Sequence, residues 1–213
     1  DFFFFLFDNE TAAAEYVVEK YEETTRSEGW EAVQVLSPMH KNPCGVANLN
    51  KLLQERMNPP VQGKDEIATP SGMLRTGDKV MQIRNNYEKE VFNGDIGKIV
   101  GINGRNISVL FPERPEGERV DYAPSELDEL QLAYAMSVHK AQGSEYRTVI
   151  IPLVPSHYML LQRNLFYTGV TRAKQRVILV GSRAAVNTAV GNDDMRKRYS
   201  LLAERMQEES NLI

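Results

Sequence analysis

The feature that most constrains the fold is an alternation of apolar strands with amphipathic helices, which opens the chain. Two buried strands are predicted at residues 2–7 and 30–36. Each is followed by a helix, at about 10–27 behind the N-cap Asn9, and at 46–60, which two prolines close. Strands that alternate with helices are typical of a parallel sheet covered by helices. The sequence therefore predicts an α/β fold.

From about residue 61 to 130 this pattern is replaced by short strands and turn signals. Strands are predicted at 77–83, 96–102, 106–111 and 119–123. Short antiparallel strands separated by Asn-Gly turns indicate a small barrel. Strands then return at 130–136, 148–154 and 176–181, with helices near 157–168, 183–190 and 194–208. We expect a parallel-sheet domain at 1–62 and 128–213 and an inserted barrel at 63–127.

Composition excludes several classes of protein. Cys44 is the only cysteine, so the chain forms no internal disulfide, and a reducing cytoplasmic setting is expected. The three histidines lie outside any zinc spacing, so no metal site is predicted. The opening DFFFFLF is too short to span a membrane and lacks the charged start of a signal peptide, and we read the chain as a piece of a longer protein. A net charge of −4 means that nucleic acid could bind only at a local basic groove.

No standard phosphate loop occurs, neither G-x-x-x-x-G-K-S/T nor G-x-G-x-x-G. Three stretches nevertheless concentrate reactive side chains beside predicted strands. They are SPMHKNPCG at 37–45, SVHKAQGSEY at 137–146, and the weak helix-forming run 168–171 that precedes Arg172. Ligands of open α/β sheets usually bind at sheet edges, so these stretches are the candidate sites.

The stretches AYAMSVHKAQGSEY and NLFYTGVTRAKQRVILVGS, with VLSPMHK upstream, resemble the later helicase motifs of the RecD-like branch of superfamily 1. GDKVMQIRNNYEKEVFNGDIG resembles the start of that family's SH3-like insert. The resemblance implies a second RecA-like motor domain with an SH3-like β-barrel, from a DNA helicase that moves 5′ to 3′. It implies ATP and Mg²⁺ as cofactors, held mainly by a first motor domain upstream in the same parent chain.

The resemblance also implies roles for individual residues. Arg172 matches the arginine finger, and Lys41 matches a basic residue facing the phosphates of ATP, although Asn42-Pro43 stands where the family tends to have glycine. Gly143 and Glu145 would face the nucleotide. Ser137, His139 and Lys140 would contact the DNA backbone. Taken singly, Arg172 could cap a helix end, Lys41 and Glu145 could be solvated charges, and His139 could be a core or cap residue.

In the barrel, one aromatic side chain is surrounded by cations and amides, a composition suited to phosphate contacts and a base stack. The candidates are Arg84, Asn85, Asn86, Tyr87 and Lys89. The alternative is a charged hairpin in which Glu88 and Glu90 neutralise the lysine.

The resemblance implies single-stranded DNA and duplex junctions as partners, in repair or recombination, and an isolated chain that hydrolyses no ATP. Two alternatives stay open. The parent could be a conjugative relaxase, which would carry a tyrosine nucleophile and a histidine metal cluster upstream. The chain could also be a nucleic-acid-binding module without catalysis, which the absence of a phosphate loop from the parent would indicate.

Overall fold

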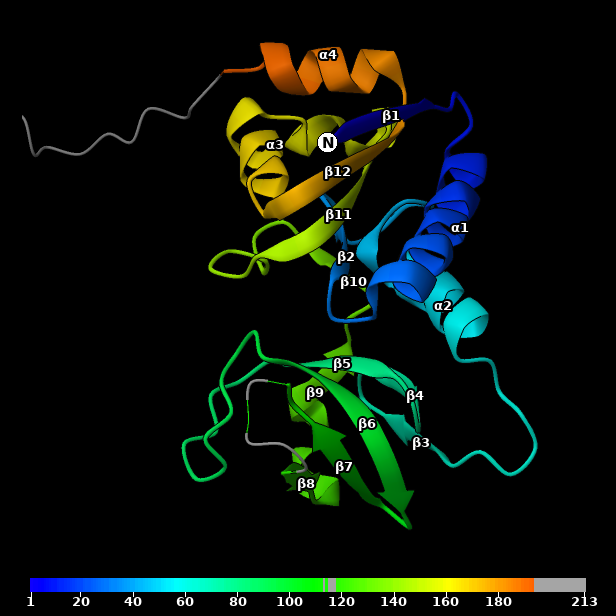
Figure 1. Cartoon of the computed structure of the whole chain (residues 1–213), viewed down its shortest axis with the longest axis vertical. Coiled ribbons are helices and arrows are strands. Elements are labelled where there is room, and N and C mark those ends of the chain that lie inside the picture. The colour runs from blue at the N-terminus through cyan, green and yellow to red at the C-terminus, as the bar shows by residue number, and fades with distance from the viewer. Residues whose placement is uncertain (113, 115–117, 194–213) are drawn as a thin grey trace, which may run out of the picture.

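A computed structural model describes residues 1–112, 114 and 118–193 and contains two separate main sheets (Figure 1). The first sheet is entirely parallel, with the order β1-β12-β11-β2-β10. Its strands are β1 (Phe2–Leu6), β2 (Val33–Ser37), β10 (Ala135–Ser137), β11 (Tyr146–Leu153) and β12 (Ala173–Gly181). The predicted α/β class is confirmed.

Four helices cover the two faces of this sheet. Helices α1 (Glu10–Glu28) and α2 (Val46–Met57) pack on one face, and α3 (Arg163–Val170) and α4 (Arg183–Gly191) pack on the other (Figure 1). The side chain of Asn9 caps α1 as predicted, accepting from the amide of Ala12 at 3.0 Å. None of the helices among the described residues is long and apolar enough to cross a membrane.

The second main sheet is antiparallel, with the order β8-β7-β6-β5-β9, and it has its own apolar core. Its strands are β5 (Lys79–Gln82), β6 (Ile96–Asn103), β7 (Asn106–Leu110), β8 (Arg119–Tyr122) and β9 (Leu130–Leu132). A hairpin that was not predicted, β3 (Glu66–Thr69) with β4 (Gly72–Arg75), lies beside it. We call residues of this sheet and hairpin the barrel, and the parallel sheet with its helices the motor domain.

The single strand predicted at 130–136 is in fact two strands in different sheets. β9 pairs antiparallel with β5 in the barrel, and β10 pairs parallel with β2 in the motor domain. Ala133 and Tyr134 join them. Because β9 belongs to the barrel sheet, we propose that the second domain boundary follows Leu132 instead of falling at 128.

The predicted helix at 157–168 is also divided. A 3-10 helix, η2 (Pro155–Leu160), precedes α3, and a second one, η1 (Pro124–Glu129), precedes β9. α2 ends at Met57, ahead of the two prolines. The predicted helix at 194–208 lies outside the described residues.

The prediction that residues 2–7 form a buried strand is wrong. Within the described part of the chain, β1 is the edge strand of the parallel sheet and pairs only with β12. Phe2, Phe3 and Leu6 are therefore 58%, 44% and 55% exposed, while Phe4 and Phe5 pack against the cores on the two faces. An apolar run alone does not distinguish a central strand from an edge strand.

Lys79 is a buried cation where the barrel meets the motor domain. Its ammonium group donates to the backbone oxygens of Trp30 and Val33, each at 2.9 Å, and lies 5.8 Å from the centre of the Trp30 ring. Burial lowers the pKa of Lys79 to about 7, opposed by the negative charge of Glu31. A β5 residue of the barrel thus binds backbone that leads into β2 of the motor domain.

We predict that Lys79 makes stability depend on pH. Its pKa is about 7 in the folded chain and 10.5 ordinarily, so between these values the unfolded chain binds more protons. The free energy of unfolding should therefore rise with pH, by up to about 1.4 kcal/mol per pH unit relative to Lys79→Met, which cannot titrate. Denaturant unfolding of both chains across this interval measures the difference. A difference that stays constant with pH would contradict the prediction.

Candidate functional site

The loop at 138–145 connects the two opposite edges of the parallel sheet. It leaves the carboxyl end of β10 at Ser137 and enters the amino end of β11 at Tyr146. The hydroxyl and carbonyl oxygens of Ser137 both accept from the amide of Lys140, at 3.3 and 3.0 Å, which folds the start of the loop into a tight turn. Ser137 and exposed His139 thus begin at one sheet edge, and Glu145 lies at the other.

Arg172 lies at the amino edge, immediately before β12, and contacts the far end of this loop. Its Nη1 donates to the carbonyl of Ser144 at 3.1 Å, and its Nε donates to the carbonyl of Thr168 at 3.3 Å. The amide of Tyr146 in turn donates to the Arg172 carbonyl at 2.8 Å. The guanidinium therefore caps carbonyls, as the alternative interpretation expected, and one of these carbonyls belongs to the 138–145 loop.

Packing and a hydrogen bond explain why weak helix formers precede Arg172. Gly169 is buried, and a Cβ built on it would lie 3.2 Å from Ile151 Cδ1 and 3.7 Å from the methyl groups of Val138. The hydroxyl of Thr171 donates to the Thr168 carbonyl at 3.0 Å. A small residue lets α3 lie close to β11 and to the 138–145 loop, and so holds Arg172 next to that loop.

Two of the other three residues predicted to face the nucleotide, Gly143 and Glu145, share this edge. Gly143 is exposed and has φ +91°, a left-handed conformation that glycine adopts at no steric cost. The Glu145 carboxylate lies 3.4 Å from the ammonium of Lys174, and both side chains are more than half exposed. An exposed pair of this kind contributes little to stability, so Glu145 can exchange its partner readily.

Lys41 does not lie with Arg172, contrary to the expectation that both face one nucleotide. The loop carrying Lys41 leaves the carboxyl end of β2, where Ser37 is the register partner of Ser137. Lys41 is therefore at the same sheet edge as Ser137, and Arg172 is at the opposite edge. Parallel strands place every strand-following loop at one edge and every strand-preceding residue at the other.

The Lys41 loop accommodates Asn42-Pro43 with a left-handed residue and with hydrogen bonds at both of its ends. Asn42 has φ +82°, in the left-handed region that glycine favours and asparagine tolerates. The Ser37 hydroxyl donates to the Cys44 carbonyl at 2.7 Å, and the amide of Val46, the first residue of α2, donates to the Met39 carbonyl at 2.9 Å. The loop is thus anchored at both ends.

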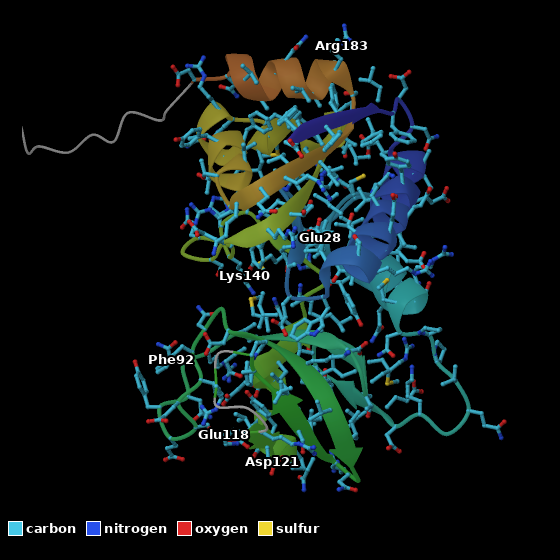
Figure 2. The ribbon with its side chains drawn as sticks, viewed as in Figure 1. Glu28, Phe92, Glu118, Asp121, Lys140 and Arg183 are labelled. Atoms are coloured by element: carbon cyan, nitrogen blue, oxygen red, sulfur yellow. The ribbon has the colours of Figure 1, made fainter. Side chains whose placement is uncertain are left out.

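A cavity of about 790 Å³ separates the motor domain from the barrel. Lys140, Gln142 and Glu145 line it from the motor domain, and Phe92 and Asp95 line it from the barrel. Figure 2 shows Lys140 at the lower surface of the motor domain and Phe92 on the barrel loop below it. Partial burial lowers the pKa of Lys140. We call this cavity the interdomain groove.

Most of the predicted DNA-binding residues of the barrel are engaged in internal contacts. Lys89 pairs with Glu126 of η1 at 2.5 Å, instead of Glu88 or Glu90, and Arg84 pairs with Asp128 at 2.8 Å. The Asn86 amide donates to Glu129 at 3.3 Å, and the Asn85 amide approaches the Tyr87 hydroxyl at 3.4 Å. The cations of this segment therefore fasten the 85–92 loop to η1.

Tyr87 is the aromatic barrel candidate, and it is open to solvent, as are Arg84 and Asn85. Its side chain is 75% exposed, and its ring lies 6.0 Å from that of Phe92 in an edge-to-face arrangement. The sequence analysis did not select Phe92, whose side chain is 44% exposed. Phe92 directly precedes the predicted Asn93-Gly94 turn, and turns lie at the surface, so its position could have indicated an exposed aromatic side chain. Among the described residues no group of three His, Cys, Asp or Glu side chains could hold a metal.

Two family models match the chain, one for each part of the structure. The ATP-dependent RecD-like DNA helicase SH3 domain matches residues 49–111, which include β3 to β7. The UvrD-like helicase C-terminal domain matches residues 132–180, which include β10, β11, α3 and most of β12. The second match contains the 138–145 loop and Arg172.

Curated relatives give the same result over most of the chain. The chain is 40% identical over 171 residues to an ATP-dependent RecD2 DNA helicase from Deinococcus radiodurans. It is 30% identical over 164 residues to a RecBCD enzyme subunit RecD from Mycolicibacterium smegmatis. These regions cover 80% and 76% of this chain but only 23% and 27% of the two relatives.

The fold is similar to that of solved Pif1 helicases. A structure of Pif1 helicases at forked double-stranded DNA matches with a TM-score of 0.52 over 97% of this chain and 53% of that one, at 16% identity. Pif1 helicase from Candida albicans matches with a TM-score of 0.51 over 94% of this chain and 57% of that one, at 14% identity. These likenesses concern the fold alone. The family models and the RecD relatives show that the chain belongs to the RecD-like helicases and corresponds to their C-terminal region.

Proposed function

We propose that the chain is the C-terminal part of an ATP-dependent DNA helicase that moves 5′ to 3′, and that it supplies an arginine finger and part of the DNA track. The observation that carries the proposal is the 138–145 loop. Its first residues lie at the carboxyl edge of the sheet, Lys140 faces the interdomain groove, and its last residues touch Arg172. Gly143, Ser144 and Glu145 line the same groove as Lys140, so this one segment holds the proposed DNA contact next to the residues proposed to face the nucleotide.

The amino edge has the chemistry required to complete an ATP site. The guanidinium of Arg172 is permanently charged and planar, and here it is held by two neutral carbonyls that it can leave without breaking an ion pair. The carboxylate of Glu145 can accept a hydrogen bond from a ribose hydroxyl. ATP with Mg²⁺ would supply the phosphoryl group, and we assign the phosphate loop and the magnesium ligand to an N-terminal motor domain of the parent.

For the DNA track we propose Ser137, His139 and Lys140 as backbone contacts and Tyr87 as a stacking surface. The hydroxyl, imidazole and ammonium groups suit phosphate oxygens, and an exposed aromatic ring suits an unpaired base. We leave Asn86 and Lys89 out of the track because partly buried carboxylates of the barrel engage them. Arg84 stays a candidate, since its pair with Asp128 is exposed and can be exchanged. Lys41 remains a candidate ATP contact only if the parent's first motor domain reaches the carboxyl edge.

We predict that the isolated 213-residue chain does not hydrolyse ATP. It holds the proposed finger but has no phosphate loop in its sequence. Phosphate release should stay at the buffer rate with magnesium and single-stranded DNA present. Turnover that co-purifies with the folded chain, and that Arg172→Ala removes, would contradict the split site.

We predict that Arg172→Ala in the parent protein lowers DNA-stimulated kcat by roughly 10³–10⁵, the range for arginine fingers in phosphoryl transfer. ATP binding should change little, because a finger acts mainly on the transition state. Steady-state ATPase and equilibrium nucleotide binding measure the two effects. Arg183→Ala, at an exposed position in α4, is the matched control and should retain full activity. A folded Arg172→Ala protein with near-normal turnover would leave Arg172 as a structural cap.

We predict that Lys140 and Lys89 differ in their effect on DNA binding by the parent. Lys140→Ala should reduce the log–log salt slope for single-stranded DNA by about 0.7, the value for one lost phosphate contact. Lys89→Ala should leave the slope unchanged, because that ammonium is paired with Glu126. Salt titrations of an oligonucleotide of any sequence measure both slopes. If the Lys140→Ala slope equals that of the wild type, the track does not include Lys140.

A further inference from the structure

The carboxylate of Asp78 is fully buried and accepts four hydrogen bonds where the barrel meets the motor domain. Oδ1 accepts from Asn58 Nδ2 at 2.6 Å and from the Tyr134 hydroxyl at 3.0 Å. Oδ2 accepts from Gln54 Nε2 at 2.6 Å and from the backbone amide of Arg75 at 2.8 Å. A buried charge is tolerated only when it is hydrogen-bonded in this way, so the arrangement is specific.

The four donors come from different parts of the molecule. Gln54 belongs to α2 of the motor domain, and Asn58 caps the end of that helix. Arg75 ends the β3–β4 hairpin of the barrel, and Tyr134 lies between the two sheets. Among the described residues Asp78 makes no salt bridge, so uncharged donors alone hold its carboxylate. The carboxylate joins the barrel, the linker and α2 at one point.

Helix α2 extends this attachment to the opposite edge of the motor sheet. The side chain of Asn50 bonds both the carbonyl and the amide of Ala135 in β10, at 2.8 and 2.9 Å. At its other end, the amide of Ala47 donates to the carbonyl of His40 at 3.0 Å, in the loop that carries Lys41. α2 is therefore fixed to β10 along its length, to the Lys41 loop at its start and to the barrel at its end.

We propose that Asp78 is a positioning residue that fixes the barrel to α2, so that barrel and motor domain move as one body and the interdomain groove keeps a constant width. The two walls of that groove, Lys140 and Phe92, belong to the two parts that Asp78 joins (Figure 2). The effect on DNA binding rests on the proposed function of the groove as a DNA track. The fixed orientation of barrel and motor domain does not depend on that function.

Asp78→Asn in the parent protein tests the proposal with minimal change in volume. An amide has one acceptor oxygen and turns an NH₂ group toward the remaining donors. The Tyr134 hydroxyl can reverse and accept, but either Asn58 Nδ2 or the Gln54 Nε2 and Arg75 amide pair then loses its acceptor. Asp121→Asn is the matched control, because Asp121 is an exposed barrel carboxylate far from the motor domain (Figure 2). Dyes placed at exposed Arg105 in the barrel and Arg183 in the motor domain report the distance between the two parts by energy transfer.

The wild type and Asp121→Asn should each show one narrow distance population, with and without oligothymidine. Asp78→Asn should show a broadened or second population, and its affinity for oligothymidine should fall by about tenfold, equivalent to about 1.4 kcal/mol. ATPase kcat at saturating DNA should change little. A positioning defect should instead raise the DNA concentration that gives half-maximal ATPase activity. If Asp78→Asn fails to fold, Gln54→Met, which removes one donor and keeps the chain length, takes its place with the same expected results.

A folded variant that keeps the single narrow population would overturn the proposal. So would a wild type whose barrel changes its distance from the motor domain when DNA binds. If the parent binds no DNA at all, the proposed function fails, but the distance populations still decide whether Asp78 fixes the barrel.

Discussion

The structure depends on the all-parallel hydrogen bonding of its five-stranded sheet. Because every strand runs in the same direction, the sheet has one carboxyl edge and one amino edge, and each connection must cross between them. Most crossings use a helix, but the 138–145 loop crosses in a short irregular segment. The loop therefore has one end at each edge, and it contacts Arg172 through the Ser144 carbonyl. The proposed DNA and nucleotide contacts all belong to this loop or to its flanking residue Ser137.

A second constraint is that the barrel is attached through buried ionisable side chains. Asp78 and Lys79 are adjacent in sequence and fully or almost fully buried. The Asp78 side chain binds α2, and the Lys79 side chain binds backbone oxygens just before and at the start of β2. Taking such groups out of water is costly, and removing one of their hydrogen-bond partners leaves a buried polar group unsatisfied. Hydrogen bonds are directional, so these contacts stabilise one relative orientation of barrel and motor domain over the others. An apolar contact of the same area would discriminate less between orientations.

Much of the fold could be predicted from local sequence. The Asn9 cap and the helix behind it, the βα alternation and most barrel strands follow from periodicity and turn signals that act over a few residues. The split of residues 130–136 could not be predicted, because an apolar strand pattern fits either sheet and the choice depends on distant partners, β5 and β2. The exposure of β1 likewise depends on its place at the sheet edge.

The candidate site was predicted less completely than the fold. The motifs selected the 138–145 loop and Arg172, which the structure brings into contact, while their roles stay predictions. The partner of Lys89 is a glutamate 37 residues away, which motif spacing cannot reveal. The separation of Lys41 from Arg172 could have been deduced, since one follows a parallel strand and the other precedes one. The role of Asp78 could not, because its donors converge only in the folded chain.

The most direct test of the central claim is a structure of the parent protein with single-stranded DNA and ADP–aluminium fluoride. We expect the guanidinium of Arg172 to leave the carbonyls of Ser144 and Thr168 and to contact the fluoride group, while Lys140 contacts a DNA phosphate. This expectation would be contradicted if Arg172 kept both carbonyl contacts and another cation of the parent contacted the fluoride.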